Sequence, residues 1–94
     1  MKLSFSITLF YPEVKNKEKT VTGIVTELLN DGFVLHRFVM DSVLLKKGKM
    51  ILEVKRGEHP EVLKITLTGW SEFFEEFYLQ CKRVYNIIGR VLQE

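Results

Sequence analysis

Hydrophobic and polar residues alternate over three stretches of the chain, and this alternation predicts strands. Over residues 2–11, 50–55 and 63–68, large apolar residues occupy every second position, as in a strand with one buried face. Pro12 ends the first stretch because it has no amide hydrogen to give to a neighbouring strand. We therefore expect a sheet with one face in the core and a mostly polar face outside.

Apolar residues recur with helical spacing over residues 70–92, which predicts an amphipathic helix of about six turns. Six of the chain's eleven aromatic residues lie on this stretch, so we expect an aromatic core around the helix, with Phe77 at its centre. The spacing of Val, Ile and Leu over residues 20–30 predicts a second helix, and Gly32 suits the left-handed cap that follows. A strand over residues 20–28 is the alternative.

Residues 33–45 are the most ambiguous part of the pattern, because their apolar residues come in triplets. Two interpretations stay open: one central strand with a bulge near residues 36–37, or two short strands separated at residues 41–42. The lysine-rich segment that follows predicts a hairpin turn, in which Gly48 can adopt a positive φ.

The resulting order of elements is strand, helix, three strands, helix. This order predicts an α+β fold with two layers: one mostly antiparallel four-stranded sheet and two helices on one of its faces. The first and second strands are expected to run in the same direction. The first strand then lies either at an edge beside a parallel neighbour or next to the third strand. The second arrangement resembles a ferredoxin-like sheet with its last strand and helix exchanged in order.

The composition is that of a globular chain, and its length of 94 residues is that of one domain. With 46% hydrophobic and 28% charged residues it does not resemble a disordered chain. No apolar run approaches the length of a membrane span. A single cysteine cannot form a disulfide within the chain, and the start of the sequence lacks the apolar run of a secretory signal. We therefore expect a cytoplasmic protein that is not inserted in a membrane.

Residues that could carry catalysis or bind a metal ion are few and scattered. His36, His59 and Cys81, with Glu58 and Glu61 beside His59, are too few for a closed zinc site. The sequence contains no glycine-rich phosphate loop and no nucleophile motif. We therefore expect no metal, no cofactor and no catalytic residue; a small enzyme assembled from scattered residues, or a ligand-sensing domain, is the third hypothesis.

The favoured hypothesis is a small interaction module that self-associates into a homodimer. If Phe33, Leu35 and Val39 face the helices, part of the apolar surface of residues 33–45 must lie on the open face of the sheet, where large apolar patches usually mark contacts. The last helix is the other candidate surface, because at roughly 34 Å it is longer than a typical strand of about 17–20 Å. The candidate interface residues are Val34, Phe38, Met40 and Ile51 on the sheet, and Ile88, Val91 and Leu92 on the helix.

Binding of nucleic acid is the second hypothesis, with a basic hairpin in contact with phosphates. The residues concerned are Lys46, Lys47, Lys49, Lys55 and Arg56. The three successive strands followed by a helix resemble the order of elements in double-stranded RNA-binding domains. The start of the last helix, however, is acidic where those domains are basic. The formal net charge of only +2 favours the interaction module over this hypothesis.

Overall fold

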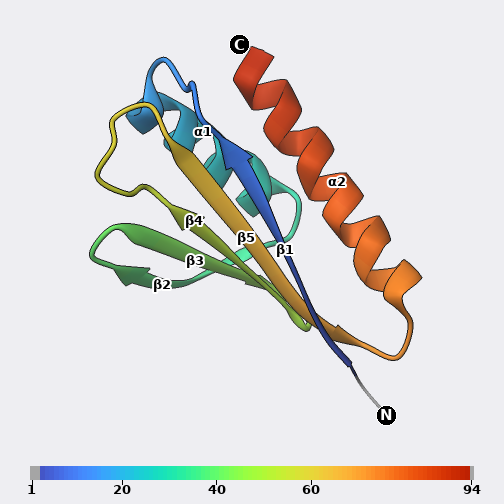
Figure 1. Ribbon diagram of the computed structural model, residues 1–94. Coiled ribbons are helices and arrows are strands. Elements are labelled where there is room, and N and C mark those ends of the chain that lie inside the picture. The colour runs from blue at the N-terminus through green and yellow to red at the C-terminus, as the bar shows by residue number, and fades with distance from the viewer. Residues whose placement is uncertain (1–2, 94) are drawn as a thin grey trace.

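The computed structural model describes residues 3–93 and confirms the α+β class (Figure 1). The elements are β1 (Leu3–Tyr11), α1 (Lys17–Asn30), β2 (Val34–Val39), β3 (Ser42–Lys47), β4 (Met50–Lys55), β5 (Leu63–Ser71) and α2 (Phe74–Gln93). The predicted count of four strands is wrong. Residues 33–45 form both a bulged strand and a second strand, because the chain turns back on itself at residues 40–41. Lys2, predicted to start the first strand, lies outside the described residues.

The five strands form one sheet in the order β1-β5-β4-β3-β2, and every neighbouring pair is antiparallel. β1 and β2 run in the same direction, as predicted, but lie at opposite edges of the sheet. Neither predicted position for the first strand is correct, because β1 pairs along its whole length with β5, from Leu3 opposite Ser71 to Tyr11 opposite Leu63. The nine-residue β5 is the longest partner available to the nine-residue β1.

The core lies between one face of the sheet and the two helices, and it is mainly aliphatic. Its largest fully buried side chains are Ile24, Leu28, Leu45, Leu52, Leu63, Ile65, Leu67 and Ile88. The predicted aromatic core is wrong: of the six aromatic residues in the stretch 70–92, only Phe77 is buried. The inward rows of β3, β4 and β5 already fill the space under the helices with branched aliphatic side chains.

The last helix begins at Phe74 and not at residue 70, because β5 continues to Ser71. Gly69 allows the strand to pass beneath the helix: a Cβ there would lie 2.9 Å from Cδ2 of Phe77. Ser71 then supports the turn into α2. Its Oγ accepts the Phe73 amide at 3.2 Å and donates to Glu76 Oε2 at 2.7 Å.

The predicted helix over residues 20–30 is confirmed, although it begins earlier, at Lys17, and the alternative of a strand is wrong. Asn16 caps it by accepting the Lys19 amide at 3.2 Å. Gly32 and Gly48 both have positive φ, +100° and +60°, as expected for the helix end and the hairpin turn. No helix in residues 3–93 is both long and apolar enough to cross a membrane.

Lys17 connects α1 to the loop between β4 and β5. Its side chain is buried, and its Nζ donates to three main-chain carbonyls, those of Arg56, His59 (2.6 Å) and Val62 (3.0 Å). A cation buried in this way is stable because each of its donors has a carbonyl partner. The loop is therefore held in place by a helix residue distant in the sequence.

Candidate interaction surfaces

A bulge near residues 36–37, expected only if residues 33–45 formed one strand, is present although they form two: the pairing of β2 with β3 shifts between Leu35 and Arg37. Leu35 lies opposite Leu45, and Phe38 lies opposite Val43, so both point to the side of the sheet that carries the helices. The bulge thus places Leu35 and Phe38 on the same side although three positions separate them.

The predicted faces of two residues in β2 are therefore wrong. Phe38 was expected on the open face and Val39 toward the helices, but the extra residue in the bulge reverses the alternation after it. Val34 and Ile51 lie on the open face as expected, each opposite Lys46. Met40 lies in the turn after β2.

β2 is exposed along its whole length, on both faces. One side of the strand pairs with β3, and the other has no partner strand among residues 3–93. The exposed fractions range from 45% for Leu35 to 71% for Phe38, and Met40 is fully exposed. We call this surface the β2 edge; it consists of Val34, Leu35, Phe38, Val39 and Met40.

The apolar side of the C-terminal end of α2 is mostly covered and does not form the expected contact surface. Ile88 is fully buried and Ile87 nearly so, which makes both part of the core. Val91 packs onto α1 at Gly23, where a Cβ would lie 2.9 Å from Cγ1 of Val91. Of the three candidate interface residues on the helix, Leu92 alone is exposed, at 36%. The helix end therefore exposes less apolar surface than β2 does.

A second apolar surface lies where the start of α2 meets β1, and the sequence pattern did not reveal it. Phe5 contacts Phe77 and Phe74, with ring centroids 5.5 Å and 5.4 Å apart, and Phe74 contacts Tyr78 at 6.0 Å. We call these four residues the aromatic cluster. About half of Phe74 and of Tyr78 is exposed, but each ring already has another ring beside it.

The five residues of the predicted basic hairpin do not form one surface. Lys47 points to the helix side, where its Nζ donates to the main-chain oxygen of Asp31 at 2.7 Å and to Asp31 Oδ2 at 3.2 Å. Arg56 pairs with Glu18 on α1. Lys46 and Lys55 lie on the open face, and Lys49 lies in the turn between β3 and β4.

Asp31 forms an ionic contact between three elements at the end of α1. Arg83 of α2 and Lys47 of β3 both donate to its carboxylate. These hydrogen bonds, that from Arg83 foremost, hold the pKa of Asp31 below its ordinary value, and Asp31 in turn raises the pKa of Arg83. The two cations offset the unfavourable position of a carboxylate at a helix C-terminus.

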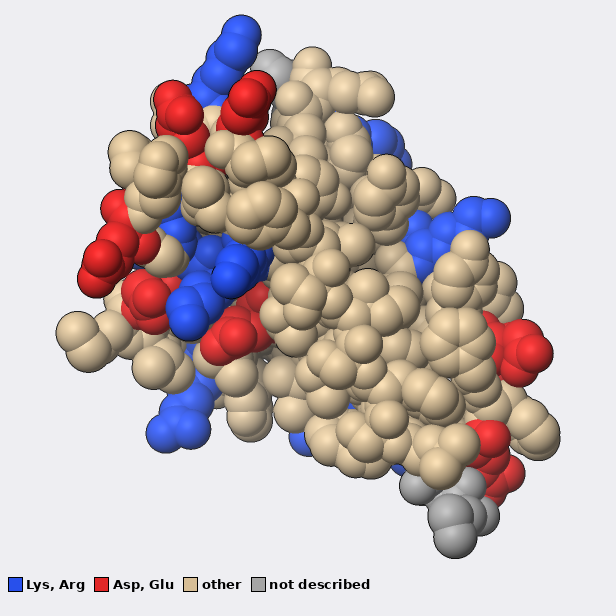
Figure 2. Space-filling view, viewed as in Figure 1, with Lys and Arg blue, Asp and Glu red and all other residues tan. Residues whose placement is uncertain are grey.

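Within residues 3–93, the strands place four cations and one carboxylate on the open face of the sheet. We call Arg37, Lys46, Lys55 and Lys64 the open-face cations; the carboxylate is Glu53. Lys55 lies directly opposite Lys64 on the neighbouring strand. Figure 2 shows Lys and Arg side chains gathered over the middle of the sheet, next to a wide uncharged area.

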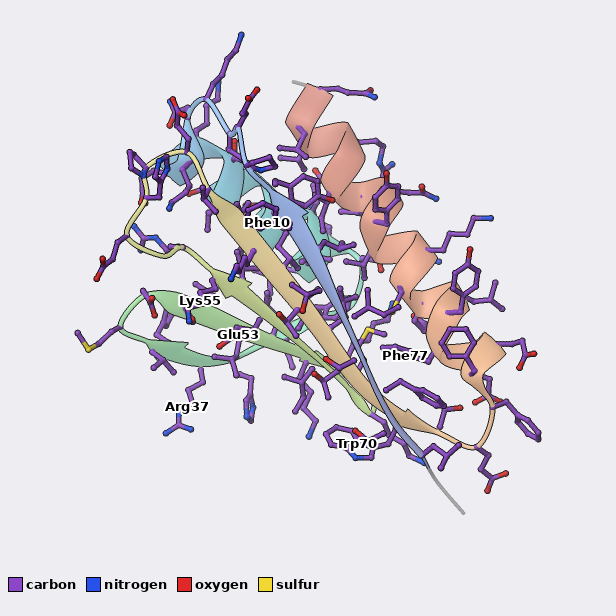
Figure 3. All side chains as sticks on the ribbon, viewed as in Figure 1. Phe10, Arg37, Glu53, Lys55, Trp70 and Phe77 are labelled. Carbon is purple, nitrogen blue, oxygen red and sulfur yellow. The ribbon has the colours of Figure 1, made fainter. Side chains whose placement is uncertain are left out.

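Two exposed aromatic residues flank these cations. Phe10 on β1 lies opposite Lys64 and is 55% exposed, and Trp70 near the end of β5 is 42% exposed. Figure 3 labels both, with Glu53 and Lys55 on β4, next to β5, and Arg37 on β2 at the opposite edge of the sheet. The side chain of Trp70 was missed as a surface residue, because the amphipathic pattern had assigned it to the last helix.

The residues considered for catalysis or metal binding remain apart. Within residues 3–93, no three His, Cys, Asp or Glu side chains are grouped so that they could bind a metal ion. Cys81 is buried, and burial raises the pKa of its thiol to about 11. His36 is exposed at the bulge, and His59 Nδ1 accepts the Glu61 amide at 3.2 Å in a loop.

Two open clefts, of 830 and 1140 Å³, flank the C-terminal end of α2. The first lies beside Arg83 and Arg90, and the second lies between the end of α2 and the connection from β1 to α1. No histidine, serine or cysteine lines either cleft in the described part of the chain.

Comparison with known proteins adds no assignment: no protein-family model matches the chain, and no curated protein shows significant sequence similarity to it.

Proposed function

We propose that this protein is a non-catalytic interaction module that forms a homodimer through β2. One observation carries the proposal: a strand with a free hydrogen-bonding edge also exposes four apolar side chains, on both of its faces, and Met40 is exposed in the turn that follows. Proteins usually guard such strands with charges, prolines or a covering helix, because a free edge can pair with another chain. β2 has a bulge and Arg37 as guards, but most of its exposed side chains are hydrophobic.

Two copies of β2 can pair in an antiparallel register about a two-fold axis through the bulge. In this register Val34 lies opposite Val39 of the second copy, and Leu35 lies opposite Phe38 of the second copy. Because Val34 and Val39 share the open side while Leu35 and Phe38 share the helix side, apolar side chains meet on both faces. The pairing extends both sheets into one, and a contact between identical surfaces closes as a dimer.

The aromatic cluster is the competing surface for self-association. We favour the β2 edge because the cluster's rings already contact one another, whereas the side chains of β2 extend beyond the helices. β1, which carries Phe5, is the other edge strand of the sheet, but its open-face side chains at residues 4, 6 and 8 are Ser, Ser and Thr. At β2, hydrogen bonds between strands would be accompanied by burial of apolar side chains on both faces.

A module of this kind needs no catalytic group and no cofactor. The thiol of Cys81 is buried, and the two histidines lie on β2 and in the loop before β5. We assign the module to the cytoplasm, where a single thiol remains reduced.

Sedimentation velocity at micromolar concentration tests the proposal. We expect the unmodified chain to sediment as a dimer and the Phe38→Glu variant as a monomer, because the new carboxylate would be buried against an apolar partner. Leu79→Glu is the matched control, since Leu79 is also an exposed apolar residue, at 63%, but lies on α2. A monomeric unmodified chain would refute self-association. Dissociation by Tyr78→Glu, with Phe38→Glu still dimeric, would assign the dimer to the aromatic cluster instead.

A further inference from the structure

The charges on the open face are arranged in a way that costs stability in the isolated protein. Lys55 and Lys64 are direct cross-strand neighbours, and like charges in this position repel. Glu53 lies one row away, opposite Thr66 on one side and Leu44 on the other, so it does not separate the two lysines. A bound polyanion would convert this repulsion into attraction by placing phosphates beside both cations.

The aromatic residues of the open face lie at the two ends of β5. Phe10 adjoins Lys64 across the pair of β1 and β5, and Trp70 lies six residues further along β5. At about 3.3 Å per residue in a strand, the two ends are separated by roughly 20 Å. Between them lie two pairs of hydroxyl groups, Ser6 with Thr68 and Thr8 with Thr66, 3.4 Å and 3.2 Å apart. These hydroxyls can exchange hydrogen bonds with bases or phosphates.

We propose that the open face binds single-stranded nucleic acid, with Phe10 and Trp70 stacked on bases and the open-face cations beside phosphates. Unpaired bases expose the faces that stack on aromatic side chains, and a basic groove beside them follows the backbone. A double helix is a poorer fit, because its bases are stacked on one another and their faces are not available to Phe10 and Trp70. The inference does not rest on the dimer, since Phe10, Trp70 and the lysine pair lie on β1, β5 and β4 and not on β2.

Trp70 provides the readout, because it is the only tryptophan in the chain. The full chain is titrated with oligothymidylate and with oligouridylate of about a dozen nucleotides, a length within the range that such surfaces cover, at low and at high salt. We expect saturable quenching of the Trp70 emission and an affinity that falls steeply as salt is raised. The affinities for the two oligomers show whether the face prefers DNA or RNA.

Variants assign the binding to the open face. We expect the double variant Lys55→Gln with Lys64→Gln to lower the affinity on the order of tenfold and to flatten the salt dependence. The matched control, Lys15→Gln with Lys82→Gln, removes the same charge from exposed positions on the β1–α1 connection and on α2; it should change affinity less than about twofold. Glu53→Gln should tighten binding, because it removes a carboxylate that lies among the open-face cations. Circular dichroism checks that each variant is folded.

Three results would overturn the inference. The first is the absence of quenching and of binding at low salt. The second is an equal loss of affinity in the control variant, which would indicate diffuse attraction by the whole chain. The third is tighter binding of a duplex than of either single strand. Phe38→Glu distinguishes this inference from the proposed dimer, because it should abolish dimerisation while the monomer still binds the oligonucleotide.

Discussion

Phe77 joins α2 to the sheet at the position where β5 has no side chain. Its ring is 4% exposed, stacks on Phe5 at an interplanar angle of 20° and occupies the space that a Cβ at Gly69 would need. The fit depends on both residues together: glycine lets the strand approach, and the aromatic ring fills the gap.

Truncation of Phe77 tests how firmly α2 is docked. We expect Phe77→Ala to lower the free energy of unfolding by ~3–5 kcal/mol, because a buried ring is lost and its cavity remains. Urea unfolding followed by circular dichroism measures the loss. Phe73→Ala is the control, since Phe73 is exposed, and a loss below about 1 kcal/mol for Phe77→Ala itself would mean that the helix does not depend on this contact.

The lowered pKa of Asp31 leads to a prediction of how the free energy of unfolding depends on pH. Because its pKa is lower in the folded chain than the ordinary value of 3.8, its contacts with Arg83 and Lys47 contribute their full stabilisation above that value, and this contribution is lost as pH falls below it and through the lowered pKa of the folded chain. We expect the urea midpoint to drop between pH 5 and pH 3, and to drop less in Asp31→Asn, which has already lost the charge. Glu58→Gln, an exposed change, should keep the full drop. An unchanged drop in Asp31→Asn would contradict the assignment.

At the scale of elements, regular patterns were predictable and local irregularities were not. Alternation located β1, β4 and the first part of β5, and helical spacing located most of α1 and α2. The end of β5 was missed because Trp70 fits the apolar arc of a helix as well as a strand. The bulge was predicted, but the number of residues it adds decides which face Phe38 takes, and that becomes visible only in the pairing with β3.

The candidate surfaces were predictable to a similar extent. The apolar excess in residues 33–45 correctly indicated exposed hydrophobic side chains. The open-face cations were missed as a group, because they come from β2, β3, β4 and β5 and meet only through the strand order. The pairing of β1 with β5 could not be read from the sequence either, since it joins strands separated by most of the chain.

Substitution of Lys17 tests whether its side chain links α1 to the loop after β4. We expect Lys17→Met to lower the free energy of unfolding by about 1–3 kcal/mol, because three carbonyls, those of Arg56, His59 and Val62, lose their shared donor. Amide exchange in the loop should accelerate as well. Lys19→Met, an exposed change two residues away, should stay within about 0.5 kcal/mol of the unmodified chain; equal effects of the two variants would remove the role given to Lys17.

At the scale of the whole molecule, the two sides of the sheet have different characters. The helix side is a closed aliphatic core except at β2, where Leu35 and Phe38 continue the apolar layer into solvent. The open side is polar and basic, with an aromatic residue at each end of β5. A dimer through β2 would cover the exposed part of the apolar layer and leave the open face accessible.

Amide hydrogen exchange at two protein concentrations tests the role of the β2 edge most directly, because it reports the hydrogen bonds that strand pairing would form. We predict that exchange in residues 34–39 slows when the concentration is raised from below micromolar to hundreds of micromolar, while exchange in α2 stays the same. Exchange in β2 that does not depend on concentration, or protection that arises at α2 and β1 instead, would contradict the β2-paired dimer.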